Sequence, residues 1–328
     1  MTATRALVTG ADGFIGSHLL ERLLEDGFDV RAFCAYNSNG SLGWLDGLDP
    51  DRRDALDVRL GDVRDARFVR MAVEGVDVVF HLAALIAIPF SYQAPGSFVE
   101  TNVTGTLNVL EALRDTGAAR LVNTSTSEVY GTPETVPITE GHPLKGQSPY
   151  SATKIAADKL CEAYALSFGT PVVTLRPFNT FGPRQSARAV IPTILGQLLS
   201  GVQEIRLGSL HPRRDFTYVG DTVDGFVRMG AADLAPGATV HLGTGTAASI
   251  GEVFELCREI TGTGARVVTE DERLRPERSE VAVLLSDPSR ARRLLGWEPG
   301  VELREGLEHT ANWLRDRVDA RAAVRFQL

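Results

Sequence analysis

The chain has 328 residues, of which 43% are hydrophobic and 23% charged, and its net charge is −8 at neutral pH. This length exceeds one minimal core and predicts one large domain or two. The acidic balance disfavours nucleic acid as a partner, because duplex binding needs a clustered cationic surface. No apolar run approaches the roughly 20 residues that cross a bilayer, and residues 1–5 show no signal peptide, so we expect a cytoplasmic protein without membrane contact.

The cysteines and histidines show no metal-binding pattern. Cys34, Cys161 and Cys257 lie far apart and form no C-x-x-C pair, so they predict reduced, packed thiols rather than a disulfide framework or a zinc site. The six histidines are equally scattered along the chain. We therefore expect no metal centre.

In the first half of the chain, short β-branched runs alternate with helical patterns, as a parallel sheet covered on both faces requires. The helical stretch 18–25 carries four leucines on one stripe and ends at Gly27. The repeated order of strand, helix and strand predicts an α/β fold with a doubly wound parallel sheet of the Rossmann type. The expected strands span residues 6–9, 29–34, 57–60, 77–82, 120–123 and 172–176.

After Pro177 the loops lengthen and arginines become frequent. Helical runs at 191–199, 250–260 and 303–318 predict a smaller, mixed and helix-rich lobe. Apolar residues in the last run recur every three or four positions, so this helix is expected to pack against the protein rather than a membrane. We assign residues 1–180 to the Rossmann domain, to which 216–247 return, and residues 181–215 and 248–328 to the second lobe.

A glycine-rich turn joins the first strand to the first helix. Its pattern, Gly10-x-x-Gly13-x-x-Gly16, lets the backbone approach a pyrophosphate, to which the following helix presents free amides. Turns use glycine anyway, but the strand before and the helix after favour dinucleotide binding. The second strand ends at Tyr36-Asn37-Ser38, with neither the acidic residue expected for NAD nor the arginine expected for NADP. The choice between NAD and NADP therefore stays open.

Tyr150 and Lys154 are four residues apart near the start of a long helix, so their side chains share one face. A nearby ammonium favours the phenolate and lowers the pKa of tyrosine from about 10 toward neutral pH. This arrangement predicts Tyr150 as a general base for a hydroxyl proton. In an arbitrary protein the pair is more often a surface tyrosine beside a solvated lysine, but downstream of a phosphate-binding turn the catalytic interpretation is favoured.

Together these residues resemble the extended short-chain dehydrogenase/reductases that act on nucleotide sugars. The resemblance covers nearly the whole chain and also rests on residues 81–84, 102–106, 125–131, 176–179 and 214–216. It implies that the first lobe binds NAD or NADP and that the second closes over a nucleotide-diphosphate sugar. Asp62 is either a contact to adenine or a helix cap. The cofactor residues implied are Gly10, Gly13, Phe14, Ile15, Gly16, Tyr36, Asn37, Ser38, Asp62, Val63, Leu82, Ala83, Ala84, Tyr150, Lys154 and Pro177.

The reaction is inferred from Thr126-Ser127-Glu128, which resembles the motif of GDP-mannose 4,6-dehydratases. The resemblance implies that Tyr150 takes the C4 hydroxyl proton, that Thr126 shares the hydrogen bond, and that Glu128 removes the C5 hydrogen acidified by the 4-ketone. Loss of the C6 hydroxyl and return of the hydride to C6 complete a 4,6-dehydration. The acid that protonates the leaving C6 hydroxyl is not decided: it is either Glu128, acting a second time, or Ser127, acting through a water molecule. A 4-epimerase, a UDP-glucuronate decarboxylase and a non-catalytic cofactor-binding regulator remain as alternatives.

Residues 36–46, 84–92, 178–192 and 273–277 resemble the UDP-N-acetylglucosamine 4,6-dehydratases of legionaminic-acid-type pathways. An arginine that often stands near position 35 in that subgroup, as a cue for a phosphate, is absent here. Two arginines are expected to clamp the substrate diphosphate, because a guanidinium fork matches phosphate oxygens. By analogy with the family we expect a homodimer built through helices at 102–114 and 150–168. The implied substrate residues are Ile86, Glu128, Asn179, Val190, Ile191, Pro192, and the clamping pair Arg214 and Arg275.

Overall fold

In the computed structural model, which describes residues 4–318, one parallel sheet of seven strands lies at the centre of the first lobe. The strands are β1 (Arg5–Thr9), β2 (Asp29–Ala35), β3 (Asp57–Gly61), β4 (Val78–His81), β5 (Arg120–Thr124), β6 (Val172–Pro177) and β11 (Thr239–Leu242). Their order is β11-β6-β5-β4-β1-β2-β3, and every neighbouring pair is parallel. This topology confirms the predicted doubly wound Rossmann-type fold.

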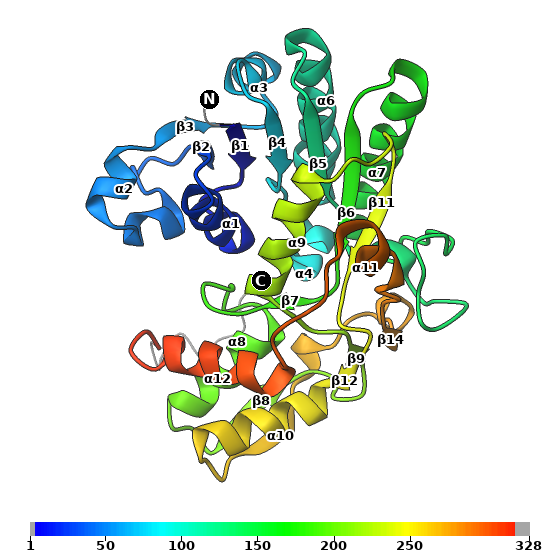
Figure 1. The fold of residues 1–328 in the computed structure, drawn as a ribbon. Helices are drawn as coiled ribbons and strands as arrows, with labels where there is room; N and C mark the ends of the chain where they lie inside the picture. The colour runs from blue at the N-terminus through cyan, green and yellow to red at the C-terminus, as the bar shows by residue number, and fades with distance from the viewer. Residues whose placement is uncertain (1–3, 319–328) are drawn as a thin grey trace.

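Helices cover both faces of the sheet (Figure 1). Successive residues of a strand point to opposite faces, so Ala6 and Val8 of β1 join one apolar cluster and Leu7 joins the other. The first cluster also contains residues of α1 (Phe14–Glu25), α9 (Val219–Ala231) and α11 (Ser289–Leu295). The second contains residues of α3 (Ala66–Val73), α6 (Gly105–Thr116) and α7 (Pro149–Phe168).

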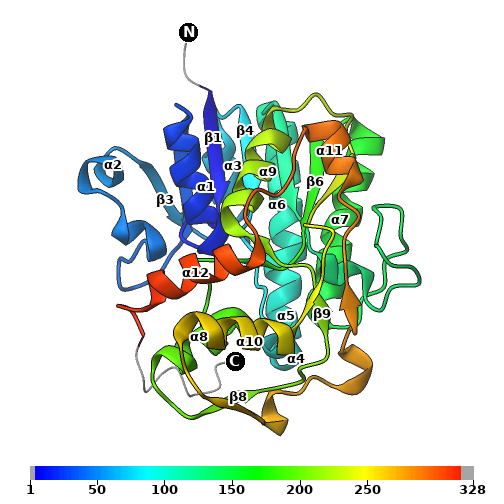
Figure 2. The same ribbon diagram turned by 60° about the horizontal axis from the view of Figure 1, so that its bottom comes forward.

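A smaller lobe faces the carboxyl ends of the strands (Figure 2). Its core joins one face of each of three helices to short strands. The helices are α8 (Val190–Leu199), α10 (Ile250–Thr261) and α12 (Leu303–Leu314). The strands pair as β8 (Glu204–Leu207) with β13 (Arg266–Thr269), β7 (Thr180–Phe181) with β10 (Thr217–Tyr218), and β9 (Arg213–Arg214) with both β12 (Ala248–Ser249) and β14 (Val283–Leu284).

Short helices occupy the connections. After β2 come a 3-10 helix at Gly43–Gly47 and α2 (Pro50–Asp54), and after β4 come α4 (Ile88–Gln93), α5 (Pro95–Phe98) and a π-helix at Val99–Thr104. Further 3-10 helices are η3 (Ser127–Tyr130), η4 (Asp271–Arg273) and η5 (Glu277–Ser279). None of the helices within residues 4–318 is long and apolar enough to cross a membrane.

Three details differ from the sequence prediction. The last helix was predicted to reach Val318 but ends at Leu314, and the next three residues are charged and exposed. The helix predicted over 102–114 begins as the π-helix at Val99–Thr104. Asp62 does not cap α3; Asp65 does, by accepting a hydrogen bond from the Phe68 amide at 3.1 Å. The ends of the two assigned lobes, residues 1–3 and 319–328, lie outside the described residues.

Candidate active site

The carboxyl ends of β1 and β4 mark the point where the direction of strand order reverses. The chain passes from β1 to β2 on one side, then returns across the sheet to place β4 on the other side of β1. In open α/β sheets, ligands bind in the crevice at this switch point. The glycine-rich turn follows β1 at this position, and the segment 82–87 follows β4.

The glycine-rich turn has the geometry that close approach of a pyrophosphate requires. Gly10 has a φ of +69°, and a Cβ added to it would lie 2.9 Å from the amide nitrogen of Ala83. A Cβ on Gly16 would overlap the carbonyl oxygen of Gly10. Gly13 stands at the N-terminus of α1 without a side-chain cap, so the first amides of the helix stay available to an anion. These residues fit a dinucleotide.

The loop after β2 is organised by two side chains. The Asn37 amide donates to the Ser41 carbonyl at 2.7 Å and accepts from the Ser41 amide at 3.1 Å, so it holds the loop, whereas Tyr36 is 73% exposed. Asp12, which the sequence reasoning missed, accepts a hydrogen bond from the Ala35 amide at 3.3 Å and thereby links the glycine-rich turn to the end of β2. Burial raises the pKa of the Asp12 carboxyl.

Asp62 is held by its own neighbour. Its carboxylate accepts hydrogen bonds from the Arg64 guanidinium, including one at 2.9 Å, and one from the Arg64 amide at 2.9 Å. These bonds to Arg64 lower the pKa of the Asp62 carboxyl. Val63 beside it is buried against the start of α6, where a Cβ on Gly105 would lie 2.9 Å from its side chain. In this structure Asp62 therefore pairs with Arg64, and Val63 packs against the start of α6, in the loop that follows β3.

The predicted catalytic residues come together at the ends of β5 and α7. The Thr126 side chain lies near the Tyr150 hydroxyl and opposes the rise of its pKa. The Thr126 hydroxyl accepts a hydrogen bond from the Glu128 amide at 3.2 Å. This bond caps η3 and fixes the backbone of Glu128. The Lys154 ammonium donates to the Thr124 carbonyl at 2.5 Å. Four side chains that the sequence places on two separate segments therefore share one site.

The pKa predicted for Tyr150 is wrong in direction for the protein chain alone. Burial raises the pKa of the Tyr150 hydroxyl, because its ring packs with Ile88 and Phe98 and little water remains to solvate a phenolate. Burial also lowers the pKa of Lys154, and the negative charge of Asp158 is the largest opposing influence. The spacing on the helix identified the pair, but it carried no information about how deeply the pair is buried.

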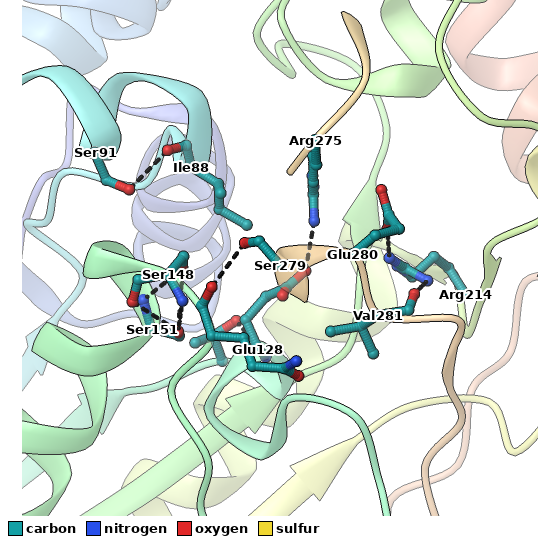
Figure 3. Close-up of polar contacts among 12 residues, drawn as sticks. Ile88, Ser91, Glu128, Ser148, Ser151, Arg214, Arg275, Ser279, Glu280 and Val281 are labelled. Carbon is teal, nitrogen blue, oxygen red and sulfur yellow. Dashed lines mark hydrogen bonds and ion pairs between the residues drawn. The ribbon is translucent and has the colours of Figure 1, made fainter. Parts of the chain in front are cut away.

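Glu128 faces a cation from the other lobe (Figure 3). Its side chain is 14% exposed, and its Oε1 lies 3.7 Å from Nη1 of Arg275. That guanidinium nitrogen is buried and has no hydrogen-bond partner among the described residues. Arg214 donates to the carbonyl of Val281 at 2.7 Å and to the carboxylate of Glu280 at 3.1 Å. Burial lowers the pKa of the Arg214 guanidinium, and Glu128 is foremost among the groups that oppose this shift.

The remaining predicted substrate residues lie in different environments. Asn179, two residues after Pro177 at the end of β6, has a buried Oδ1 with no hydrogen-bond partner among the described residues. Ile86 is 65% exposed in the segment after β4. Ile191 and Pro192 are buried in the first turn of α8, where Ile191 packs in the core of the smaller lobe, and Val190 is half-buried beside them. The side chain of Ile191 therefore acts in packing.

The segment that carries Arg275 crosses this site, and its anchoring contacts were missed in the sequence prediction (Figure 3). The Ser279 hydroxyl pairs with the Tyr92 hydroxyl at 2.5 Å and donates to the Gln147 carbonyl at 2.7 Å. The Gln147 amide donates in turn to the Arg278 carbonyl at 2.8 Å. The segment 275–281 is thus tied to α4 and to the residue before the N-cap of α7. Neither serine nor glutamine carried a local sequence signal for this contact.

A phosphate-binding turn, a tyrosine–lysine pair and two arginines at the carboxyl ends of a doubly wound sheet define a dinucleotide-dependent enzyme of the short-chain dehydrogenase/reductase class. Residues 7–310 match the family model described as GDP-mannose 4,6 dehydratase. The chain belongs to the extended branch of that class, the family of nucleotide-sugar dehydratases and epimerases.

Relatives within this family differ in their reactions. A UDP-glucose 4-epimerase of Mycolicibacterium smegmatis is 33% identical over 95% of this chain and 99% of its own length. The UDP-glucuronic acid decarboxylase 1 of Xenopus tropicalis is 32% identical over 97% of this chain and 74% of its own. The dTDP-glucose 4,6-dehydratase DesIV of Streptomyces venezuelae, solved with NAD and TYD bound, superposes with a TM-score of 0.86 at 30% identity, over 96% of this chain and 98% of its own.

Proposed function

We propose that this protein catalyses the NAD(P)-dependent 4,6-dehydration of a nucleotide sugar, with UDP-N-acetylglucosamine as the substrate. The observation that carries the proposal is the position of Glu128, whose backbone is fixed by Thr126 beside Tyr150. Oxidation and reduction at C4 alone need a proton acceptor for one hydroxyl. A carboxylate in the same site adds a second proton acceptor, which removal of the C5 hydrogen requires.

The residues present fit the cofactor. Gly10, Gly13 and Gly16 leave the space that a pyrophosphate needs, and the uncapped start of α1 supplies amides. When bound, the nicotinamide accepts a hydride from the sugar and returns it within the same turnover. The end of β2 keeps both NAD and NADP as candidates, because Ala35-Tyr36-Asn37 offers neither a carboxylate nor a guanidinium. DesIV was solved with NAD.

In the proposed reaction the protein moves two protons. Tyr150 accepts the proton of the C4 hydroxyl, and the neighbouring Thr126 side chain hydrogen-bonds that hydroxyl and orients it. The resulting 4-ketone acidifies the C5 hydrogen, which Glu128 removes. The C6 hydroxyl then leaves as water after protonation by Glu128, or by Ser127 through a water molecule. As the hydride returns to C6, a proton returns to C5, and the proton that Tyr150 took from the C4 hydroxyl completes the balance, so that the substrate loses one water overall. Lys154 keeps its ammonium beside the end of β5 and supports negative charge on Tyr150.

For the substrate, Arg214 and Arg275 are proposed to bind the diphosphate. Both reach the site from the smaller lobe, and Arg275 already faces the carboxylate of Glu128. We also propose a homodimer through the outer faces of α6 and α7, since Leu166 and Phe168 of α7 are 80% and 55% exposed.

The test of the proposal separates its two proton transfers. Glu128→Gln keeps the shape of the side chain and removes its basicity, so C4 oxidation should persist, seen as nicotinamide absorbance, while exchange of the C5 hydrogen with solvent deuterium should stop. Mass spectrometry of the products from UDP-, GDP-, dTDP- and CDP-sugars identifies the reaction: loss of one water supports a dehydratase. Dehydration by Glu128→Gln at the wild-type rate would contradict the assignment of the base.

The position of Arg275 favours a second candidate, decarboxylation of UDP-glucuronate. That reaction needs a cation near the substrate carboxylate at C6. In this second candidate Arg275, whose guanidinium lies 3.7 Å from the proposed acid–base residue, binds that carboxylate, and the diphosphate is left to Arg214. The same panel of nucleotide sugars decides, because this reaction releases carbon dioxide rather than water. A product of unchanged mass would instead indicate a 4-epimerase, and no product at all a cofactor-binding regulator.

A further inference from the structure

A buried ion pair lies next to the loop 125–130, the catalytic loop, which carries Thr126 and Glu128. The proposed reaction gives this ion pair no role. The Nη2 of Arg176, on β6, lies 2.9 Å from the Oδ2 of Asp158, on α7. Their side chains are 7% and 4% exposed. Asp158 follows Lys154 by one helical turn, as Lys154 follows Tyr150, so the three side chains form one row on α7.

Asp158 reaches the start of the catalytic loop. Its carboxylate accepts a hydrogen bond from the Ser125 hydroxyl at 2.6 Å, and one from the Asn123 amide at 3.3 Å. Ser125 directly precedes Thr126, whose side chain lies near the Tyr150 hydroxyl. The backbone at Thr126 is therefore fixed from α7 through the hydroxyl of Ser125.

Arg176 reaches the other end of the same loop. Its Nη1 donates to the hydroxyl of Tyr130 at 2.6 Å, and its guanidinium lies 5.2 Å from the centre of the Tyr130 ring. Tyr130 is the last residue of η3, and its hydroxyl also pairs with His241 at 2.5 Å. Glu128 lies between the two anchored ends. A four-residue 3-10 helix has too few hydrogen bonds of its own to hold a carboxylate in one place.

We propose that Asp158 is a positioning residue: together with Arg176 it holds both ends of the loop 125–130, and so fixes Thr126 and Glu128 relative to Tyr150 and Lys154. The inference rests on the proposed function for the roles of those four residues. Asp158 is suited to this task because a carboxylate accepts several hydrogen bonds at once, and Arg176 because its fork reaches two partners in fixed directions.

The charge of Asp158 is part of the arrangement. Arg176 and Lys154 are both buried cations, and Asp158 is the carboxylate that faces both of them. A buried pair that loses one partner leaves an uncompensated charge, and the structure then relaxes to solvate it. Asp158→Asn keeps the size of the side chain and an acceptor for Ser125 but removes the charge. We therefore expect Arg176 to lose its contacts with residue 158 and Tyr130, and the loop 125–130 to become more mobile.

The experiment compares Asp158→Asn with Ser125→Ala, Tyr130→Phe and a control, Glu162→Gln. Glu162 lies one turn beyond Asp158 on α7, where it is half exposed and paired with Lys159. Two measurements are made: kcat and KM for the nucleotide sugar, and amide hydrogen exchange of the peptide spanning 124–131. We expect Asp158→Asn to lower kcat by about 100-fold, as misplaced catalytic groups do, while KM stays within about threefold, since the arginines that bind the diphosphate are unchanged.

Amide exchange in segment 124–131 should be faster in Asp158→Asn than in the control, and Ser125→Ala and Tyr130→Phe should each show part of both effects. Should Asp158→Asn fail to fold, Ser125→Ala and Tyr130→Phe, which change no charge, test the inference by themselves. Wild-type kcat and wild-type exchange in all three would overturn the inference, as would a change confined to KM. A wild-type enzyme that converts no nucleotide sugar would defeat the proposed function instead, and the exchange measurement would still decide whether Asp158 holds the loop.

Discussion

At the scale of single residues, the proposed chemistry depends on one hydroxyl. Burial raises the pKa of Tyr150, and the neighbouring Thr126 side chain opposes this shift. A phenol in this position loses its proton only when neighbouring positive charge supports the phenolate, which assigns that task to Lys154. Since the hydroxyl makes few contacts, its removal should affect the reaction far more than the fold.

We therefore predict that Tyr150→Phe abolishes C4 oxidation, with at least about a 100-fold loss of kcat, because the hydroxyl proton has no acceptor. Thermal unfolding should show a change of only about 1 kcal/mol. The matched control is Tyr164→Phe on the same helix, whose hydroxyl bonds Glu111 away from the site. Turnover by Tyr150→Phe at the rate of the control would refute the mechanism.

The glycine-rich turn leads to a second prediction at this scale. A methyl group on Gly16 would overlap the carbonyl of Gly10, whereas one on Gly47 would meet no atom within 4 Å. Gly16→Ala should therefore raise the dissociation constants of NAD and NADP more than about tenfold, or 1.4 kcal/mol, in calorimetric titration. Gly47→Ala should bind both as the wild type does. Equal affinity in the two variants would show that the pyrophosphate lies elsewhere.

The sequence predicts this site in part. Tyr150, Lys154 and the glycines lie within single local patterns, and a pattern of spacing suffices to find them. The contact between Glu128 and Arg275, and the one between Ser125 and Asp158, join segments that meet only when the sheet and the second lobe have formed. No periodicity records such a contact, and the depth of burial that sets the pKa of Tyr150 is equally a property of the folded chain.

At the scale of elements, α7 carries the proposed catalytic pair, Tyr150 and Lys154, close to its first turn. Ser148 caps the helix: its hydroxyl accepts from the Ser151 amide at 3.1 Å, and the Ser151 hydroxyl accepts from the Ser148 amide at 3.0 Å. The same reciprocal capping box begins α10, where Ser249 and Glu252 exchange hydrogen bonds. The two caps should contribute alike to stability, but only one of them lies two residues from Tyr150.

We predict that Ser148→Ala and Ser249→Ala each lower the free energy of unfolding by about 1 kcal/mol, the usual contribution of an N-cap. Only Ser148→Ala should also lower kcat, because fraying of the first turn of α7 moves Tyr150 away from Thr126. Urea denaturation and steady-state kinetics measure the two effects. If both variants lose activity equally, or neither does, the cap has no role in placing the tyrosine.

Prediction of the elements succeeded where they are long and regular. The β-branched runs identified the first six strands of the sheet, and the leucine stripe identified α1. Two-residue strands such as β9, β10 and β14 were missed, because two residues have no periodicity and pair only through the tertiary structure. The early end of α12 was missed for a related reason. The apolar spacing in the sequence continues to Val318, but the helix ends at Leu314, and the spacing alone does not show where packing ends.

At the scale of the whole molecule, the net charge of −8 gives a misleading view of the ligand. The proposed ligands are two diphosphates, and the molecule meets them with local features: the uncapped start of α1 and the guanidinium groups of Arg214 and Arg275. Exposed carboxylates elsewhere are paired with arginines across the surface, for example Asp29 with Arg5 at 2.5 Å. Where the charges lie thus matters more than their sum.

Two histidines buried in the sheet make the stability of the whole fold sensitive to acid. Burial lowers the pKa of His81 and of His241 to about 3 each, and both rings are neutral partners in hydrogen bonds, to Thr9 at 2.8 Å and to Tyr130 at 2.5 Å. In the unfolded chain their pKa is about 6.5. Between pH 6.5 and about 3 the unfolded state therefore binds more protons than the folded state, so stability falls as the pH falls through this window.

Each histidine should remove up to about 1.4 kcal/mol of stability per pH unit in that window. Burial raises the pKa of Glu140, whose amide-bound carboxylate lies beside His241, and this shift acts in the opposite direction. The measurement is therefore a difference: urea unfolding of the wild type and of His241→Gln from pH 7 to pH 5. The variant is less stable at pH 7, but its stability should fall less steeply with acid, since one proton-binding difference is gone. Equal slopes would contradict the lowered pKa of His241, which burial and the nearby guanidinium of Arg176 cause.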